Sequence, residues 1–163
     1  MEIPVYFFTG FLESGKTSFI ESILKDPNFA EGERTLLLMC EDGEVEYDYE
    51  LLRDTNCVLK LVENQEDFNR LLLHECNRKY KPERVIVEWN GMWKLSDIKP
   101  GTFPKSWTLY QTVTTVNAQT FDVYFQNMGG YMFEMLQQTD MIVFNRSDEK
   151  TKEIVKNRRV RLI

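Results

Sequence analysis

Short apolar runs alternate along the chain with segments whose apolar residues recur at helical spacing. The runs cover residues 3–8, 35–39, 57–61, 84–87, 110–116 and 141–144. Runs of this length that are rich in β-branched and aromatic residues are typical of buried strands. After the first run, apolar residues within 19–24 keep the spacing of one helix face and stop before Asp26 and Pro27, which predicts a helix.

Three more segments have a helical pattern. One follows Asn64, a candidate cap, and its apolar face would consist of Phe68, Leu71, Leu72 and Cys76. Another covers 118–138, and Gly129-Gly130 is expected to break or bend it. The last covers 149–158. Strands that alternate with helices predict an α/β fold, with a mostly parallel sheet and helices on both faces.

Length, charge and cysteine content narrow the class of protein. A chain of 163 residues can bury a substantial core, so a single domain over 1–163 is expected. The formal net charge of −6 argues against a nucleic-acid partner, because phosphate backbones are bound by clustered lysine and arginine. No apolar run approaches the roughly 20 residues of a membrane helix, and the start is not a secretory signal. The 3 widely spaced cysteines suggest no disulfide framework, which fits a cytoplasmic location.

The segment GFLESGKT matches the phosphate-binding pattern G-x-x-x-x-G-K-[ST]. Its glycines let the backbone turn its N–H groups toward an anion, and the following helix adds the positive end of its dipole. Lys16 would reach the β- and γ-phosphates, and the Thr17 hydroxyl would bind Mg²⁺. The residues expected to hold the nucleotide here are Gly10, Glu13, Ser14, Gly15, Lys16, Thr17 and Ser18.

The last apolar run ends in Asn145-Arg146-Ser147-Asp148, which resembles the N-K-x-D motif that reads guanine. The Asp148 carboxylate would accept two hydrogen bonds from the guanine edge, whereas adenine would leave it unpaired. Asn145 would tie this loop to the phosphate loop. Arg146 stands where the motif has lysine, and an arginine can also stack over the base. An ordinary turn is the alternative interpretation of the same four residues.

The order of these motifs resembles the CobW family of GTP-binding metallochaperones. TGFLESGKTS is similar to that family's opening TGFLGSGKTT, and CEDGEVEYD is similar to its NExGxVxxD segment, with matches at Glu41, Gly43, Val45 and Asp48. VIVEWNGMW has the family's strand ending in ExxG, VTTVNAQTF resembles its next strand, and IVFNRSD its guanine motif. The resemblance covers about residues 3–150.

The resemblance implies a P-loop α/β domain of the SIMIBI type. It also implies that Glu41 and Asp48 lie in a switch-like segment that senses Mg²⁺ and the γ-phosphate, with Glu41 as a ligand of Mg²⁺. Lys16, Glu41, Asp48 and Glu88 are the expected catalytic residues. A solvated acid-rich loop is the alternative for the segment 41–50. Glu88 would hold a magnesium-bound water in place of the usual Walker B aspartate, and the Gly91 N–H would meet the γ-phosphate.

One family motif is degenerate here. The family's CxCC motif falls on Cys57-Val58-Leu59-Lys60, so only Cys57 remains as a candidate ligand for Zn²⁺ or Co²⁺. One thiolate cannot supply the coordination set of a tight zinc site. Cys40 would approach Cys57 if their strands are neighbours, although buried, inert thiols are the simpler interpretation.

The sequence therefore predicts a cytoplasmic GTP-binding protein that hydrolyses GTP slowly and acts on a metal-enzyme client. Two alternatives remain: a nucleotide-binding regulatory module that handles no metal, and a small-molecule kinase that uses ATP. Family members usually continue into a C-terminal domain, so this chain could equally be a truncated piece, a short relative or half of a split protein.

Overall fold

A computed structural model of the chain describes residues 1–29, 31–41, 43, 46–149 and 152–153. Its centre is a sheet of 6 parallel strands in the order β3-β2-β4-β1-β5-β6. The strands are β1 (Ile3–Thr9), β2 (Thr35–Met39), β3 (Cys57–Leu61), β4 (Arg84–Glu88), β5 (Trp107–Asn117) and β6 (Met141–Asn145). The prediction of an α/β fold with a parallel sheet is confirmed.

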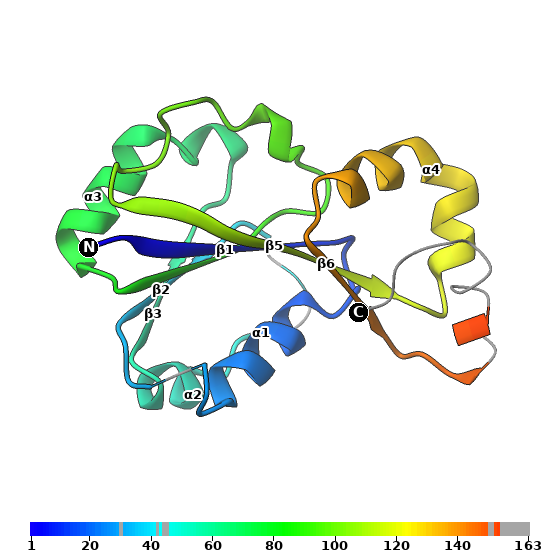
Figure 1. Cartoon of the computed structure of the whole chain (residues 1–163), viewed down its shortest axis with the longest axis horizontal. Coiled ribbons are helices and arrows are strands. Elements are labelled where there is room, and N and C mark those ends of the chain that lie inside the picture. Colours follow the sequence, from blue (N-terminus) through cyan, green and yellow to red (C-terminus); the bar gives the residue numbers. More distant parts are fainter. Residues whose placement is uncertain (30, 42, 44–45, 150–151, 154–163) are drawn as a thin grey trace.

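Helices cover both faces of this sheet, as predicted. Figure 1 shows α3 (Arg70–Tyr80) and α4 (Phe121–Gln137) above it, and α1 (Lys16–Lys25) and α2 (Tyr49–Asp54) below it. Neighbouring strand residues serve opposite faces: Phe7 packs in the cluster that contains Leu73 of α3, and Phe8 packs with Ile20 of α1. No helix among the described residues is long and apolar enough to cross a membrane.

The helix predicted after Asn64 begins later in the structure. A short 3₁₀ turn, Gln65–Asp67, comes first, and the Asn69 side chain caps α3 by accepting a hydrogen bond from the Leu72 N–H at 3.0 Å. Since asparagine is a good cap at either position, the sequence alone did not distinguish them. The later start turns Leu73 into the core and leaves Leu71 exposed.

Two of the other predicted helices agree with the structure. Helix α1 ends at Lys25 with Asp26 as its cap, as expected. Helix α4 is kinked at Met128, directly before Gly129-Gly130, which confirms the predicted bend. Helix α2 begins at Tyr49, inside the acid-rich segment 41–50, where no helix was predicted. Of the helix predicted over 149–158, residues 150–151 and 154–158 lie outside the described residues, as does Val45 of the switch-like motif.

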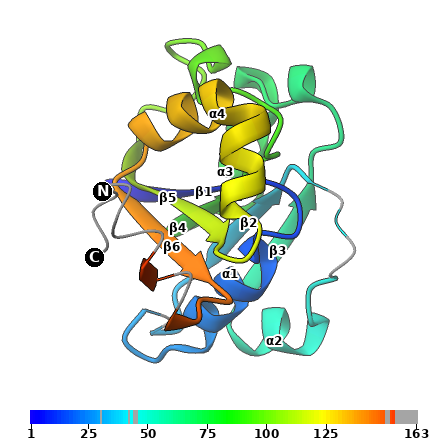
Figure 2. The same cartoon turned by 90° about the vertical axis from the view of Figure 1, so that its right-hand side faces the viewer.

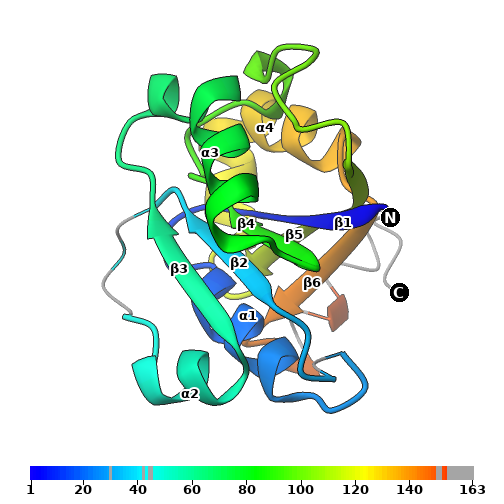
Figure 3. The same cartoon turned by 90° about the vertical axis from the view of Figure 1, so that its left-hand side faces the viewer.

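All strands run in the same direction, so their carboxyl ends meet at one edge of the sheet. The loops after β1, β2, β4 and β6 all leave from this edge, which carries the phosphate loop, Glu41, Glu88 and Asn145. Figures 2 and 3 show the two ends of the sheet, β6 on one side and β3 on the other. Ligands of open parallel α/β sheets bind at this edge.

Candidate functional site

The phosphate loop connects β1 directly to α1, as the sequence predicted. Gly15 adopts a left-handed backbone (φ 94°) immediately before the first helical residue, a conformation that glycine reaches without strain. The Ser14 hydroxyl lies 2.7 Å from the Thr115 hydroxyl of β5. The Phe11 ring stacks on Tyr124 of α4 with 4.8 Å between ring centroids. The loop is therefore held in shape by β5 and α4.

Lys16 is buried at the mouth of this loop, with 4% of its surface exposed. Its ammonium group donates to the carbonyl oxygens of Gly10 and Phe11, the latter at 3.3 Å, and forms an ion pair with Glu41. An ammonium group buried in this way needs partners with negative charge or free lone pairs. Phosphate oxygens are partners of the same kind.

Thr17 and Glu88, the residues expected to bind Mg²⁺ and its bound water, are in contact with each other. The Thr17 hydroxyl donates to Glu88 Oε1 at 2.8 Å, across the gap between α1 and the end of β4. Burial raises the pKa of Glu88, although hydrogen bonds from Tyr47 and Thr17 and the charge of Lys16 act in the opposite direction. A hydroxyl and a carboxylate are hard oxygen ligands, so these residues fit Mg²⁺.

Tyr47 contributes to the site, and the sequence analysis did not select it. Its hydroxyl donates to Glu88 Oε2, and the side chain is buried with 4% of its surface exposed. Burial and the neighbouring Glu88 charge raise the pKa of Tyr47, so its hydroxyl stays protonated and remains a donor. Tyr47 thus attaches the switch-like segment to Glu88, the carboxylate expected to hold a magnesium-bound water. The acidic segment contains both Tyr47 and Tyr49, and no motif distinguishes the one that has this role.

Gly91 lies against the phosphate loop, as the ExxG motif implied. Its N–H donates to Glu41 Oε1 at 3.2 Å, and its carbonyl accepts from the Tyr131 hydroxyl of α4 at 3.0 Å. A Cβ atom added at Gly91 would lie 2.3 Å from the Gly10 carbonyl oxygen, well inside the contact distance. Only glycine allows this approach of two backbones.

The guanine motif is next to the phosphate loop. A Cβ atom added at Gly15 would lie 2.2 Å from Asn145 Nδ2, so the amide packs directly on the loop glycine. The Asn145 Oδ1 atom accepts from the Arg146 N–H at 2.9 Å. Arg146 and Asp148 are exposed at the rim. Asn145 thus contacts the phosphate loop as expected. Recognition of a guanine base by residues 145–148 stays a prediction.

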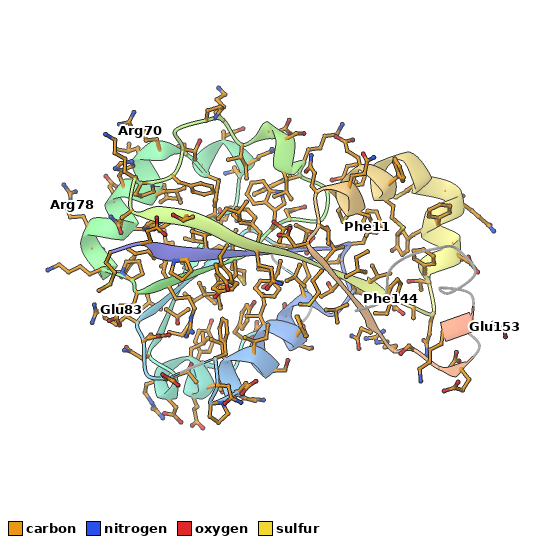
Figure 4. All side chains as sticks on the ribbon, viewed as in Figure 1. Phe11, Arg70, Arg78, Glu83, Phe144 and Glu153 are labelled. Carbon is orange, nitrogen blue, oxygen red and sulfur yellow. The ribbon has the colours of Figure 1, made fainter. Side chains whose placement is uncertain are left out.

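Most of these side chains line one open cleft of about 300 Å³. Its residues are Phe11, Leu12, Glu13, Gly15, Lys16, Thr17, Ser18, Glu41, Gly43, Glu88, Asn145 and Arg146. Figure 4 shows Phe11 of the phosphate loop right of centre, between the sheet and α4, and Glu83, just before β4, far to the left.

Six candidate residues are not part of this lining: Gly10, Ser14, Asp48, Cys57, Gly91 and Asp148. Gly10 and Ser14 belong to the phosphate loop and Gly91 lies against it, whereas Asp48 and Cys57 have other surroundings.

Asp48 does not line the cleft: its carboxylate caps α2 by accepting from the N–H groups of Glu50 and Leu51, at 3.0 and 3.3 Å. Its own N–H donates to Glu21 of α1 at 2.8 Å. The described geometry therefore gives Asp48 a structural task, and contact with Mg²⁺ or phosphate remains a prediction.

Cys57 lies at the amino ends of the strands, whereas the phosphate loop lies at their carboxyl ends. It is the first residue of β3 and pairs with Thr35, the first residue of β2. Although β2 and β3 are neighbours, Cys40 follows Thr35 by five residues, so the two thiols are separated by about 16 Å along the strands. Burial raises the pKa of Cys57 to about 12. Among the described residues, no group of 3 or more histidine, cysteine or acidic side chains is placed to hold a metal ion.

A glycine loop between a parallel strand and a helix, with a buried lysine and a carboxylate beside its threonine, defines a P-loop nucleotide-binding domain. Within that class, the chain belongs to the CobW/HypB/UreG nucleotide-binding domain family, whose model matches residues 4–162. The resemblance drawn from the motifs is thereby confirmed.

A solved structure agrees on the fold. The hydrogenase maturation factor HypB from Archaeoglobus fulgidus is similar to this chain, with a TM-score of 0.62 and 19% sequence identity. The similarity covers 99% of this chain and 80% of that protein. No curated protein matches the sequence.

Proposed function

We propose that this protein binds GTP with Mg²⁺ and hydrolyses it slowly to GDP. The observation that carries the proposal is the convergence of the phosphate loop, the Thr17–Glu88 pair and the Asn145 motif on one cleft. The first two elements suit a triphosphate with Mg²⁺, and the third suits a guanine base. The protein would act in the cytoplasm, as its cysteine content suggests.

Each side chain then has a role that follows from its position. The loop N–H groups and Lys16 would neutralise the phosphates, and the Gly91 N–H would approach the γ-phosphate. Mg²⁺, when bound, would offset charge on the phosphates; Thr17 and Glu88 would hold it. No sequence motif in the chain supplies a water-positioning glutamine or an arginine finger, so a rate on the order of 10⁻⁴ s⁻¹ is expected.

The family membership supports a client that is a metal enzyme, with the nucleotide state controlling the contact through the acidic segment 41–50. The position of Cys57 favours a narrower role, in which the protein is a nucleotide-dependent regulatory module that carries no metal itself. An ATP-using small-molecule kinase is the third candidate, and the base preference separates it from the other two.

We expect GTP to bind about 5- to 150-fold more tightly than ATP, and Asp148→Ala to remove most of this difference. The reason is that an unpaired carboxylate costs about 1–3 kcal/mol when adenine replaces guanine. Competition binding of both nucleotides measures the ratio. Glu149→Ala, which removes a neighbouring exposed carboxylate, is the matched control and should keep the preference. Equal affinity of the unmutated protein for both nucleotides would contradict guanine recognition by this motif.

We also expect this chain to bind Zn²⁺ or Co²⁺ only weakly. At neutral pH the Cys57 thiol is protonated, since its pKa is raised to about 12, whereas a metal ligand must be a thiolate. Calorimetric titration of the nucleotide-loaded protein tests this, with Cys76→Ser as the control for loss of a thiol elsewhere. A stoichiometric nanomolar zinc site that disappears in Cys57→Ser would show that the metal function survives here.

A further inference from the structure

The Glu41 carboxylate binds the two groups that a γ-phosphate is expected to bind. One oxygen, Oε2, pairs with the ammonium group of Lys16, and the other, Oε1, accepts from the Gly91 N–H at 3.2 Å. These donors come from different elements, the start of α1 and the turn after β4. A carboxylate that spans both is in the position of an anionic ligand.

The ion pair between Lys16 and Glu41 is largely buried. The Lys16 side chain is 3% exposed and the Glu41 side chain 10% exposed. Charges buried to this extent are screened little by salt, so their attraction is stronger than that of a surface ion pair. Lys16 has no second carboxylate partner among the described residues, and its remaining contacts are the neutral carbonyls of Gly10 and Phe11. Glu41 is therefore the carboxylate in direct contact with Lys16, and Glu88 is near enough for the Lys16 charge to act on its pKa.

We infer that Glu41 occupies the γ-phosphate position of the nucleotide-free protein and that a triphosphate must displace it. The inference rests on the proposed function. A diphosphate has no group at that position, so GDP can bind while Glu41 keeps both contacts. GTP cannot, because two anions would compete for Lys16 and for the Gly91 N–H. Glu41 thus lowers the affinity for GTP relative to GDP.

The displacement would also reach the switch-like segment. Glu41 follows β2, and the described residues after it are attached at Tyr47, which donates to Glu88, and at Asp48, whose N–H donates to Glu21. Release of Glu41 removes the anchor at the beginning of this segment and leaves those at its end. The γ-phosphate is in this way coupled to the contacts of Glu41, the first residue of the segment.

The variant Glu41→Gln tests the inference. Glutamine keeps the shape and an oxygen acceptor for Gly91 but removes the charge that holds Lys16. Affinity for a non-hydrolysable GTP analogue should rise about tenfold, which equals about 1.4 kcal/mol, and affinity for GDP should change less than threefold. Titrations of the protein with each nucleotide, done once with Mg²⁺ and once with a chelator, measure both affinities. Glu46→Gln, a change at an exposed carboxylate of the same segment, is the matched control and should alter neither affinity.

A second variant protects the test against a folding defect. Glu41→Asp keeps the charge but is one methylene shorter, so it cannot span both donors, and it too should raise analogue affinity relative to GDP. An equal change for both nucleotides in both variants would overturn the inference. So would weaker analogue binding seen only with Mg²⁺, because that result would make Glu41 a magnesium ligand. An unmutated protein that binds no guanine nucleotide would overturn the proposed function itself, and the inference with it.

Discussion

Lys16→Ala is expected to lower the affinity for GTP by about 10²- to 10⁴-fold. The lysine is the buried positive charge of the phosphate loop, and it would donate to two phosphate groups. Hydrogen bonds to charged groups contribute about 1.5–3 kcal/mol each, so losing two of them gives a change of this size. Titration with GTP measures it, and circular dichroism checks that the fold is intact.

Two further variants make this result specific. Lys25→Ala removes an exposed lysine from the last turn of the same helix and should leave nucleotide binding unchanged. Lys16→Ala combined with Glu41→Gln avoids a buried carboxylate without a partner, so any unfolding caused by that charge should be relieved. If the single variant folds and binds GTP as the unmutated protein does, the phosphate loop is not a nucleotide site.

Gly91→Ala is expected to disrupt the site through backbone contact. The added Cβ atom would lie 2.3 Å from the Gly10 carbonyl oxygen and 2.9 Å from Phe11 Cα. No change of side-chain rotamer relieves these contacts, so the phosphate loop or the turn after β4 must move. We expect a loss of about 2–3 kcal/mol in the free energy of unfolding, the range of overpacked interiors, together with reduced GTP affinity.

Chemical denaturation and nucleotide titration measure the two effects separately. Gly129→Ala is the matched control, because nothing lies within 4 Å of a Cβ atom added there and the position is helical. It should be neutral or stabilise the protein by up to about 1 kcal/mol. If Gly91→Ala is as stable as the unmutated protein and binds GTP as tightly, the close approach of the two backbones is not required for stability or for nucleotide binding.

The parts of the site that follow from local patterns could be read from the sequence. The phosphate loop lies between an apolar run and a helix. Gly15 precedes that helix, and Asp26 and Pro27 follow it. The pairing of Asn145 with Gly15 followed from motif order. The helix α2 could also have been found, because Asp48 precedes it as a good N-cap residue and Leu51 and Leu52 follow.

Other features depend on information that spacing along the chain does not carry. Cys57 matched a metal position by its place in the sequence, yet only the register of β2 against β3 shows that it lies at the far edge of the sheet. The contacts of Tyr47 with Glu88 and of Tyr131 with Gly91 join segments 41 and 40 residues apart. Neither tyrosine belongs to a motif with a regular period, so periodicity could not identify them.

The strand order has a consequence for when the nucleotide site can form during synthesis. The first strand, β1, has as its two neighbours β4 and β5, and the Thr9 hydroxyl meets that of Thr114 across 105 positions of the chain. Contacts of such long range are made late in folding, since a large loop must close first. The phosphate loop is among the earliest segments to leave the ribosome, but β5 supplies its supporting contact at Thr115. A growing chain that stops before β5 would contain the whole glycine motif and still lack a site that can hold a nucleotide.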